Sequence, residues 1–339
     1  MQTQTPRTVR PAPGLSYHLV HQPDTLEGIM NGTTAAVPQE FGLSVALPES
    51  HLLYTDGPGR HHDLHVPIEA LRRSALFVAH RYFRVPEERP VVFSTIELDA
   101  VGIEAWRRTP GPDPASGLLS ASGAGEMQLD LVLEPADVVN GVPRGLECRA
   151  VLRLDGAPAG SVTSRLVFLM PKVYLNHRSR GRATSRVGCI PGTQALMLDD
   201  KPSPASVGRT DPANVVIGRV EYHQDDTLSV RVAADPGHPV FSEGAPDHVP
   251  SVVLLEASRQ AALLQASQLQ GFAPADCVLT RWSADFQGFA EPDLPLYCSA
   301  SAGRLERDPE GRPVLALTLR LGQGSRYIGQ IETAVLQDC

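Results

Sequence analysis

An internal repeat constrains the fold of this chain more than any other feature. Shifting the sequence by 187 positions superimposes residues 51–76 on residues 238–263 without a gap. Nine of the 26 paired positions are identical, where ordinary composition gives roughly one or two. The identical pairs are His51/His238, Gly57/Gly244, His61/His248, Val66/Val253, Glu69/Glu256, Ala70/Ala257, Arg72/Arg259, Ala75/Ala262 and Leu76/Leu263. The repeat therefore predicts a tandem duplication of one structural module.

Length and composition fit two modules of similar size. The chain has 339 residues, which is long for one core, and half of it is an ordinary domain length. A net charge of −8 argues against non-specific nucleic-acid binding. No apolar run is long enough to span a membrane, and the first residues lack the core of a signal peptide, so we expect a soluble cytoplasmic protein. Five scattered cysteines without a Cys-x-x-Cys pair predict reduced thiols and no metal.

Hydrophobic periodicity predicts the same element order in both halves. Apolar residues at helical spacing predict helices over residues 66–83 and 252–270. Alternating apolar and polar residues predict a strand before each helix and four after it, over 41–48, 91–101, 127–135, 147–156 and 160–170, and over 228–235, 277–286, 294–301, 313–321 and 327–336. One long helix followed by a four-stranded antiparallel meander is the hotdog arrangement, in which the sheet wraps around the helix. We therefore expect an α+β tandem hotdog whose modules pair as a pseudo-dimer.

These patterns predict four segments. Residues 1–25 form an extended lead-in, 26–171 the first module, 172–212 a linker that is first Arg-rich and then Pro/Ser-rich, and 213–339 the second module. The linker contains Arg178 and Arg180, and an arginine offers a planar fork that meets phosphate oxygens in pairs. A solvated connection explains the same charges equally well.

An acid and a base three positions apart mark each predicted helix. Glu256 and Arg259 project from one face of the second helix, and Glu69 and Arg72 repeat the pair in the first. A carboxylate among apolar neighbours is costly unless it is paired or used. An exposed ion pair copied by the duplication would explain the pattern without any function.

The turn before the second helix, residues 247–251, is a candidate binding site for a carbonyl oxygen. Free backbone N–H groups at a helix N-terminus stabilise developing negative charge, and Ser251 stands at this point. His238 and His248 precede the helix and would carry protons or donate hydrogen bonds, although a single histidine more often has a structural role.

Other common sites find little support. The cluster HHDLH, residues 61–65, resembles a metal site but lacks an accompanying carboxylate or cysteine ligand set. The chain has no Gly-x-Ser-x-Gly elbow, no phosphate-binding P-loop and no dinucleotide loop. We accordingly expect neither covalent catalysis nor a cofactor.

The stretch DHVPSVVLLEASRQAA, residues 247–262, resembles the A-factor biosynthesis (AfsA-like) hotdog family. These enzymes begin the synthesis of γ-butyrolactone and related signalling molecules in filamentous actinobacteria. PKVYLNHR at 171–178 and FQGFAEPDLPLY at 286–297 extend the likeness in the right order over nearly the whole chain. The sequence departs from the family at Ser251, where Gly is usual, at Leu64, where Pro is expected, and at Arg73, which replaces a Gln.

The resemblance implies an acyltransferase. Its substrates would be a β-ketoacyl thioester on acyl carrier protein and dihydroxyacetone phosphate, and its product an ester that cyclises to a butenolide phosphate. The functional acid and base of the family fall on Glu256 and Arg259, and the acid of the first module on Glu69. Glu256 would take the hydroxyl proton, and Arg259 would bind the phosphate or orient the carboxylate.

Two other functions remain open at this point. A dehydratase or thioesterase of the hotdog superfamily would use the same helix pair without a phosphate acceptor. A non-catalytic acyl-binding module would keep the space between helix and sheet and lose the chemistry. Beyond the intramolecular pseudo-dimer, a further homo-oligomer is compatible with the sequence.

Overall fold

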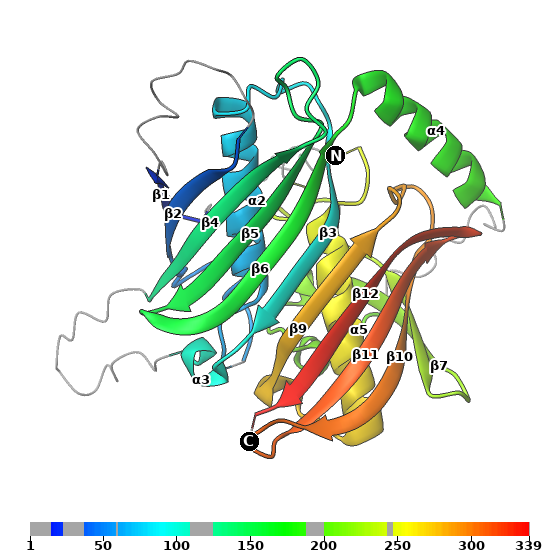
Figure 1. Ribbon diagram of the computed structural model, residues 1–339. Helices are drawn as coiled ribbons and strands as arrows, with labels where there is room; N and C mark the ends of the chain where they lie inside the picture. The colour runs from blue at the N-terminus through cyan, green and yellow to red at the C-terminus, as the bar shows by residue number, and fades with distance from the viewer. Residues whose placement is uncertain are drawn as a thin grey trace, which may run out of the picture.

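The computed structural model describes residues 15–22, 37–58, 60–108, 125–187, 200–242 and 247–338. Several predictions fall outside these ranges: most of the lead-in, residues 188–199 of the linker, and Gly244, Cys189 and Cys339. The described part contains two similar halves that lie side by side (Figure 1).

Twelve antiparallel strands form one continuous sheet. Their spatial order is β1-β2-β4-β5-β6-β3-β9-β12-β11-β10-β8-β7. In the first half the strands are β1 (Tyr17–Gln22), β2 (Gln39–Ala46), β3 (Val91–Ala100), β4 (Glu126–Ala136), β5 (Gly145–Leu154) and β6 (Ala157–Phe168). In the second half they are β7 (Ile217–Tyr222), β8 (Thr227–Val232), β9 (Cys277–Phe286), β10 (Leu296–Arg307), β11 (Pro313–Gln323) and β12 (Arg326–Gln337).

The two halves repeat the same strand order outward from the central pair β3 and β9, which we call the seam. These strands pair in antiparallel register from Thr95 opposite Asp285 to Asp99 opposite Arg281. On either side the order of corresponding strands is the same, from β6 and β12 outward to β1 and β7. The predicted double hotdog with joined sheets is therefore confirmed.

The strand order differs from the predicted meander in one respect. The first strand after each helix pairs with the last, β3 with β6 and β9 with β12, and not with the next strand along the chain. A two-residue turn, such as Asp155–Gly156 between β5 and β6, forces consecutive strands to pair. The connection from β3 to β4 spans residues 101–125 and includes the short helix α3 (Ile103–Trp106), so β3 is free to lie at the seam.

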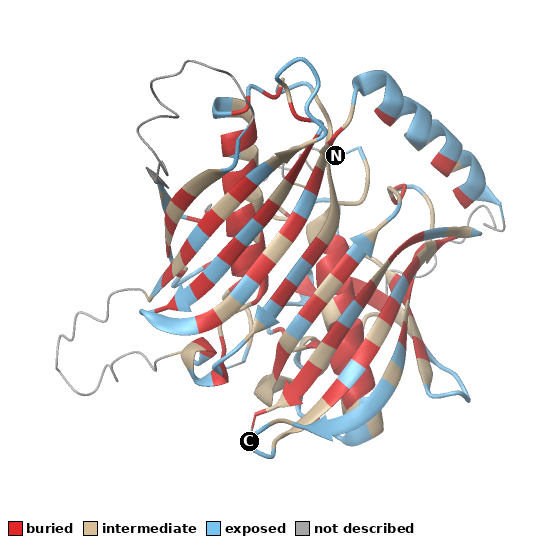
Figure 2. Ribbon diagram, in the orientation of Figure 1, coloured by how far each residue is buried: buried red, intermediate tan, exposed pale blue. Residues whose placement is uncertain are grey.

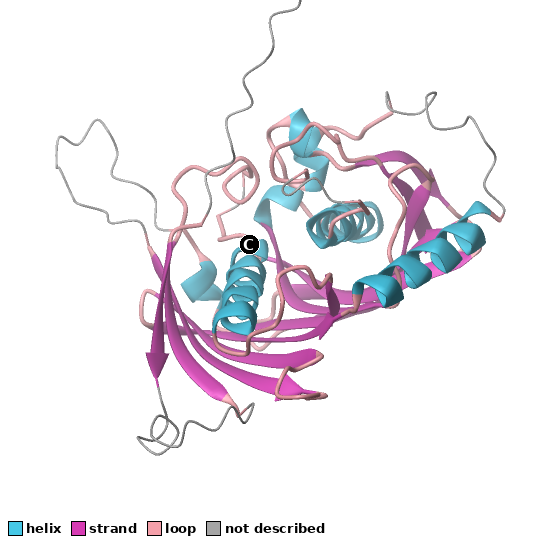
Figure 3. Ribbon diagram, turned by 90° about the horizontal axis from the view of Figure 1, so that it is seen from above, coloured by secondary structure: helices cyan, strands magenta, loops and turns pink. Residues whose placement is uncertain are grey.

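Helices α2 (His65–Arg81) and α5 (Ser251–Gln270) lie on the same side of the curved sheet (Figure 3). Along the strands, buried and exposed residues alternate, with the buried ones facing the helices (Figure 2). Four alanines of α5 are completely buried, and their small side chains let the helix pack closely on the sheet: Ala257, Ala261, Ala262 and Ala266. Both predicted helices are thus confirmed, each within one or two residues of its predicted bounds.

The segment predicted as a linker contains helix. Its Arg-rich part is α4 (Pro171–Arg186), and its Pro-rich part contains the 3₁₀ turns η2 (Pro204–Val207) and η3 (Pro212–Asn214). Gly181 of α4 packs on the second module so tightly that a Cβ there would lie 1.9 Å from Arg326 Nη1. A further 3₁₀ turn, η4 (Pro274–Asp276), precedes β9. No helix in the described ranges is long and apolar enough to cross a membrane.

Candidate active site

Three neighbouring cavities follow the seam beneath α2 and α5. The first, which we call the basic cavity, encloses about 690 Å³ with its mouth included. Its lining contains Arg108, Arg209, Arg259, His61 and His62, together with Asp56 and Asp63. The middle cavity is mainly apolar and is lined by Ile68, Leu71, Phe93, Ile96 and Leu255. The distal cavity is lined by Val91, Phe286, Phe289 and His248.

Adjacent cavities share walls, so they form a series. Tyr54, His65 and Ile68 line both the basic and the middle cavity. Phe93 and Ser251 line both the middle and the distal cavity. The three cavities therefore lie in a row, with arginine and histidine side chains in the wall at one end, an arrangement suited to a molecule with an apolar chain and an anionic head.

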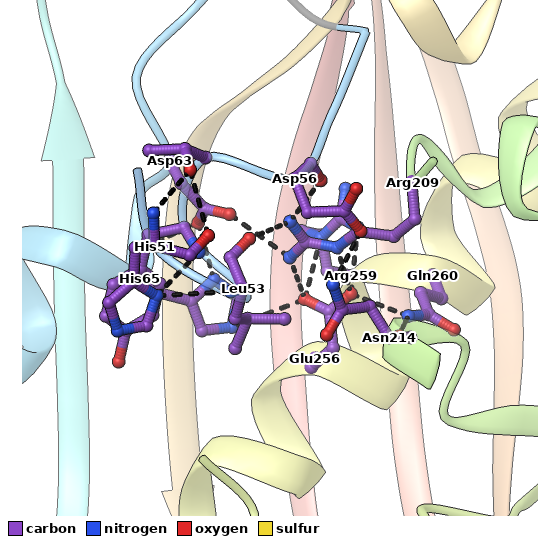
Figure 4. Close-up of polar contacts among 12 residues, drawn as sticks. His51, Leu53, Asp56, Asp63, His65, Arg209, Asn214, Glu256, Arg259 and Gln260 are labelled. Carbon is purple, nitrogen blue, oxygen red and sulfur yellow. Dashed lines mark hydrogen bonds and ion pairs between the residues drawn. The ribbon is translucent and has the colours of Figure 1, made fainter. Parts of the chain in front are cut away.

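Glu256 lies at the centre of a buried ionic network beside the basic cavity (Figure 4). Arg209 reaches both carboxylate oxygens, at 2.8 Å from Nε to Oε1 and 2.7 Å from Nη2 to Oε2. Arg259 does the same, at 2.9 Å from Nε to Oε2 and 2.8 Å from Nη2 to Oε1. Gln260 Nε2 donates a fifth hydrogen bond, at 2.6 Å to Oε1. The predicted pair Glu256 and Arg259 is thus in contact, with a second arginine added.

This environment keeps Glu256 ionised. Burial alone would raise the pKa of Glu256, but the charges and hydrogen bonds of Arg209 and Arg259 outweigh burial and hold the pKa far below its usual range. Its side chain is completely buried and lines none of the three cavities. A carboxylate with five donors and a lowered pKa is a weak proton acceptor, which favours a positioning role over proton transfer.

Arg209 joins this network to the first module. Its Nη1 donates to the carbonyl oxygens of Leu53, at 2.6 Å, and Asp56, at 2.9 Å, and its Nη2 lies 3.1 Å from Asp63 Oδ2. All five N–H positions of this almost fully buried guanidinium therefore point to acceptors. The segment between the modules thus supplies a central residue of the site.

Asp63 in turn orients His65, the first residue of α2. Asp63 Oδ1 accepts the backbone N–H of His65 at 2.9 Å and lies 2.8 Å from His65 Nδ1. Burial would raise the pKa of Asp63, but the neighbouring His65 and Arg209 hold it well below its usual range. An ionised carboxylate only accepts hydrogen bonds, so Nδ1 carries a hydrogen, and the lone pair of an uncharged ring would lie at Nε2.

The first module contains a related but different cluster around Glu69. Arg72 binds both oxygens of Glu69, at 2.6 Å each, and Arg73 Nε donates to Oε1 at 2.6 Å. Burial would raise the pKa of Glu69, but the two arginines lower it. Glu69 and Arg72 line the middle cavity. The two predicted acids therefore lie on different helices. Glu69 is in the wall of the middle cavity, whereas Glu256 is buried behind the cavity walls.

His238 and its counterpart His51 adopt the same local structure. His51 Nδ1 accepts the backbone N–H groups of Leu53 and Tyr54, both at 3.1 Å, and the ring stacks on Tyr54. His238 Nδ1 accepts the N–H of Val240 at 3.3 Å, and its ring stacks on Phe241. Burial lowers the pKa of both rings, to about 4 for His51. Neither ring lines the three cavities, so these contacts account for their identity in the repeat.

The other predicted site residues lie nearer the distal cavity. Ser251 begins α5, and its helix N-terminus has no side-chain cap. His248 Nδ1 lies 2.8 Å from Asp247 Oδ1. Arg178 of α4 binds both oxygens of the buried Glu291, at 3.0 and 2.7 Å, whereas Arg180 is exposed on the same helix. The structure does not bring Arg178 and Arg180 to the basic cavity.

Arg108 lines the basic cavity without a carboxylate partner. Its Nη2 donates to the carbonyl oxygen of Tyr54 at 3.0 Å, and among the described residues it forms no ion pair. Burial lowers the pKa of Arg108, the negative charge of Asp63 raises it, and the positive charge of Arg209 lowers it. The neighbouring His62 is held neutral, because burial and Arg108 lower its pKa to about 4. An anion in this cavity would therefore meet a guanidinium that is not bound to a carboxylate among the described residues.

Sequence reasoning missed Arg108, Arg209, Asp63 and the pairing of His65. Asp63 and His65 lie inside the HHDLH cluster. An aspartate two positions before a histidine, at the start of a predicted helix, was the sequence signal that could have identified this pair. Among the described residues no group of three His, Cys, Asp or Glu side chains could hold a metal ion. Arg209 carried no signal, because it meets Glu256 across 47 positions of sequence.

The joined sheets, the two central helices and the cavities along the seam define a double-hotdog protein. Comparison with known families places it further. The chain belongs to the A-factor biosynthesis hotdog family, whose sequence model matches residues 2–170 and 200–336.

Several relatives share the name 2-oxo-3-(phosphooxy)propyl 3-oxoalkanoate synthase. The protein from Streptomyces coelicolor is 29% identical over 266 residues, which cover 77% of this chain and 73% of the relative. The protein from Streptomyces virginiae is 25% identical over 283 residues, covering 83% and 85%. That from Streptomyces griseus is 27% identical over 262 residues, covering 77% and 76%.

Solved structures of a thioesterase and of a dehydratase-cyclase domain align with most of the chain. The 12:0-ACP thioesterase from Umbellularia californica has a TM-score of 0.47 and 10% identity, covering 87% of this chain and 93% of that one. The bifunctional dehydratase-cyclase domain in ambruticin biosynthesis has a TM-score of 0.46 and 16% identity, covering 97% and 96%.

Proposed function

We propose that the protein is an acyltransferase that joins a β-ketoacyl group, delivered as a thioester, to the free hydroxyl of dihydroxyacetone phosphate. The observation that carries this proposal is the row of cavities that ends at Arg108, a half-buried arginine without a carboxylate at ion-pair distance among the described residues. The names of the Streptomyces relatives describe the same ester, a 3-oxoalkanoate joined to a phosphooxypropyl group. Family membership over nearly the whole chain supports transferring that activity.

The reaction requires one bond to form and one to break. The hydroxyl oxygen of the acceptor attacks the thioester carbonyl carbon, the C–S bond breaks, and the hydroxyl proton finally resides on the released thiol. The ester product cyclises by intramolecular condensation to a butenolide phosphate, the first step towards a γ-butyrolactone-type signalling molecule. The acyl chain would occupy the middle and distal cavities, because their walls are mainly apolar.

The N-terminus of α5 is suited to stabilise the carbonyl oxygen. Ser251 and Val252 line the middle cavity, and their backbone N–H groups precede the first intrahelical hydrogen bonds, which are donated by Val253 and Leu254 to Pro250. Two donors at the positive end of a 20-residue helix would hold the negative charge that develops in the transition state.

Arg108 would bind the phosphate group of the acceptor. A guanidinium can bind two phosphate oxygens at once. Among the described residues only Nη2 of Arg108 donates a hydrogen bond, so the other nitrogen atoms remain as donors for the phosphate. Arg209 and Arg259 are already bound to Glu256, so their role would be to shape the compartment and raise its positive potential. Of the two roles predicted for Arg259, we therefore propose orientation of the Glu256 carboxylate and not binding of the phosphate.

Acyl carrier protein is the proposed donor of the acyl group. The distal cavity is lined by His248 and Phe289, and Phe289 contacts Tyr174 of α4. The thioester would enter at this end. The intramolecular pseudo-dimer supplies both walls of the site within one chain, since the first module contributes His65 and Glu69 and the second contributes Ser251 and Arg259.

Incubation of the protein with a β-ketoacyl thioester, with and without dihydroxyacetone phosphate, tests the function. Mass spectrometry should detect the phosphorylated ester, with one thiol released per ester, only when the acceptor is present. Thiol release at the same rate without acceptor would instead identify a thioesterase, and an enoyl or hydroxyacyl product would identify a dehydratase.

Substitution of Arg108 tests the phosphate site. Arg108→Gln should raise the KM for dihydroxyacetone phosphate about 10- to 100-fold, because one charged hydrogen-bonding group is lost. The KM for the thioester should change little. Arg107→Gln is the matched control, since Arg107 is not part of the cavity lining and pairs with Asp338. Equal effects of the two substitutions on the acceptor KM would contradict the assignment.

A further inference from the structure

We infer that His65, oriented by Asp63, is the general base of the acyl transfer. This inference rests on the proposed function and names the group that removes the acceptor's proton. Its Nε2 is buried and has no hydrogen-bond partner among the described residues, although its Nδ1 is bound to Asp63. A buried nitrogen with a free lone pair is costly in a folded protein unless a ligand completes it.

The position of His65 matches the point where the substrates would meet. It is one of three residues shared by the basic and the middle cavity. An acceptor held by Arg108 in the basic cavity and a thioester carbonyl near Ser251 in the middle cavity would both approach this junction. The ring lies at the N-terminus of α2, opposite the N-terminus of α5, and within 3.8 Å of Glu256 Oε2.

The carboxylates on both sides of the ring suit the proposed proton transfer. As the acceptor oxygen attacks, His65 Nε2 takes its proton and the ring becomes positively charged. Asp63 on Nδ1 and Glu256 beside Nε2 would stabilise that charge. When the C–S bond breaks, the ring returns the proton to the thiolate, so that His65 ends neutral. Glu256 therefore supports the chemistry without taking the proton. Its charge lies beside Nε2, and it binds Arg209, which in turn binds Asp63.

Other candidate bases are less suited. His61 also lines the basic cavity, with Nε2 at 2.9 Å from Asp338 and a buried Nδ1 without a hydrogen-bond partner, but it does not line the middle cavity. Glu69 accepts three hydrogen bonds from Arg72 and Arg73. Burial raises the pKa of Tyr54, which makes its hydroxyl a poor source of a base. Among the described residues lining the junction, His65 alone combines an orienting carboxylate with a free ring nitrogen.

Two substitutions of His65 test the inference. His65→Asn keeps a donor near Asp63, and His65→Gln keeps a polar group near the position of Nε2, but neither amide can accept the proton. Each variant that folds should lose about 10²- to 10⁴-fold in kcat, which is the usual contribution of a general base. The KM values for both substrates should stay within about threefold of the wild-type values, because binding is left intact.

His80→Gln is the matched control, since His80 lies at the far end of the same helix and binds the carbonyl oxygen of Val85. It should keep the wild-type kcat. Binding of the thioester can be followed by the fluorescence of Trp282, whose ring centre lies 6.4 Å from that of His65. A folded His65 variant that binds the thioester and keeps more than about a third of kcat would overturn the inference.

These outcomes separate the two proposals. A wild-type protein that forms no ester would overturn the proposed function, and the role of His65 with it. A wild-type protein that forms the ester, together with active His65 variants, would leave the function standing and remove only the general base.

Discussion

At the scale of single residues, the site depends on how buried charges are shared. Glu256 and Glu69 are equivalent positions of the repeat, and each binds two arginines. The difference is depth, because the Glu256 side chain is fully buried and Arg209 is 3% exposed, whereas Arg72 and Arg73 are 30% and 25% exposed. Breaking the deeper cluster leaves positive charge buried without compensation.

We therefore expect Glu256→Gln to lower the free energy of unfolding by about 3–5 kcal/mol, the usual effect of removing one partner of a buried ion pair. Glu69→Gln is the control and should cost about 1 kcal/mol, since its arginines can turn towards water. Urea denaturation followed by circular dichroism measures both. Equal losses for the two variants would contradict a special structural role for the Glu256 network.

At the scale of elements, α4 is held to the second module by few but strong contacts. Arg178 binds Glu291, whose side chain is fully buried, and Arg178 Nη2 also donates to the carbonyl oxygen of Asp247 at 2.6 Å. Arg182 adds a bond to Glu291 at 3.2 Å. Arg178 and Arg182 of the Arg-rich segment, which suggested phosphate binding, therefore hold α4 on the second module.

Arg178→Ala should loosen α4 without unfolding the hotdog modules. The remaining Arg182 side chain is 38% exposed and cannot replace a bidentate partner of a buried carboxylate. Amide hydrogen exchange of residues 171–186 should accelerate about tenfold or more, which corresponds to a local loss of at least about 1.4 kcal/mol. Arg180→Ala, at an exposed position, should leave exchange unchanged. Unchanged exchange in Arg178→Ala would show that Arg178 does not hold α4 in place.

At the scale of the whole molecule, the seam makes two copies of a module into one folding unit. Leu98 of β3 lies opposite Trp282 of β9, and Ile96 lies opposite Ala284, with all four side chains buried. The chain has two tryptophans, and the other, Trp106, belongs to the first module. Each module thus contains its own fluorescent reporter.

We expect both tryptophans to report one cooperative transition. In Trp106→Phe and in Trp282→Phe, urea unfolding followed by the remaining tryptophan should coincide with unfolding followed by circular dichroism, because the sheet is continuous across the seam. Each variant serves as its own reference, so a change in stability from the substitution does not matter. A fluorescence midpoint that differs from the circular dichroism midpoint would show that the modules unfold separately.

The sequence by itself determined the modules and most of their elements. The repeat, the helical spacing around Glu69 and Glu256, and the alternation in strands such as β5 and β11 are local patterns, and each depends on residues a few positions apart. The same patterns placed an acid and a base on each helix, and Glu256 does contact Arg259 because residues three apart share a helix face.

The tertiary structure alone decided the strand order and the membership of the site. β3 pairs with β6 across a long connection, and Arg209 reaches Glu256 across 47 positions and Asp63 across 146. Hydrophobic periodicity does not predict contacts between residues so far apart in sequence, because these contacts depend on how remote segments pack together in the tertiary structure. For this reason the sequence pointed to Glu256 as the proton acceptor, whereas the packing surrounds Glu256 with donors and leaves the free nitrogen on His65.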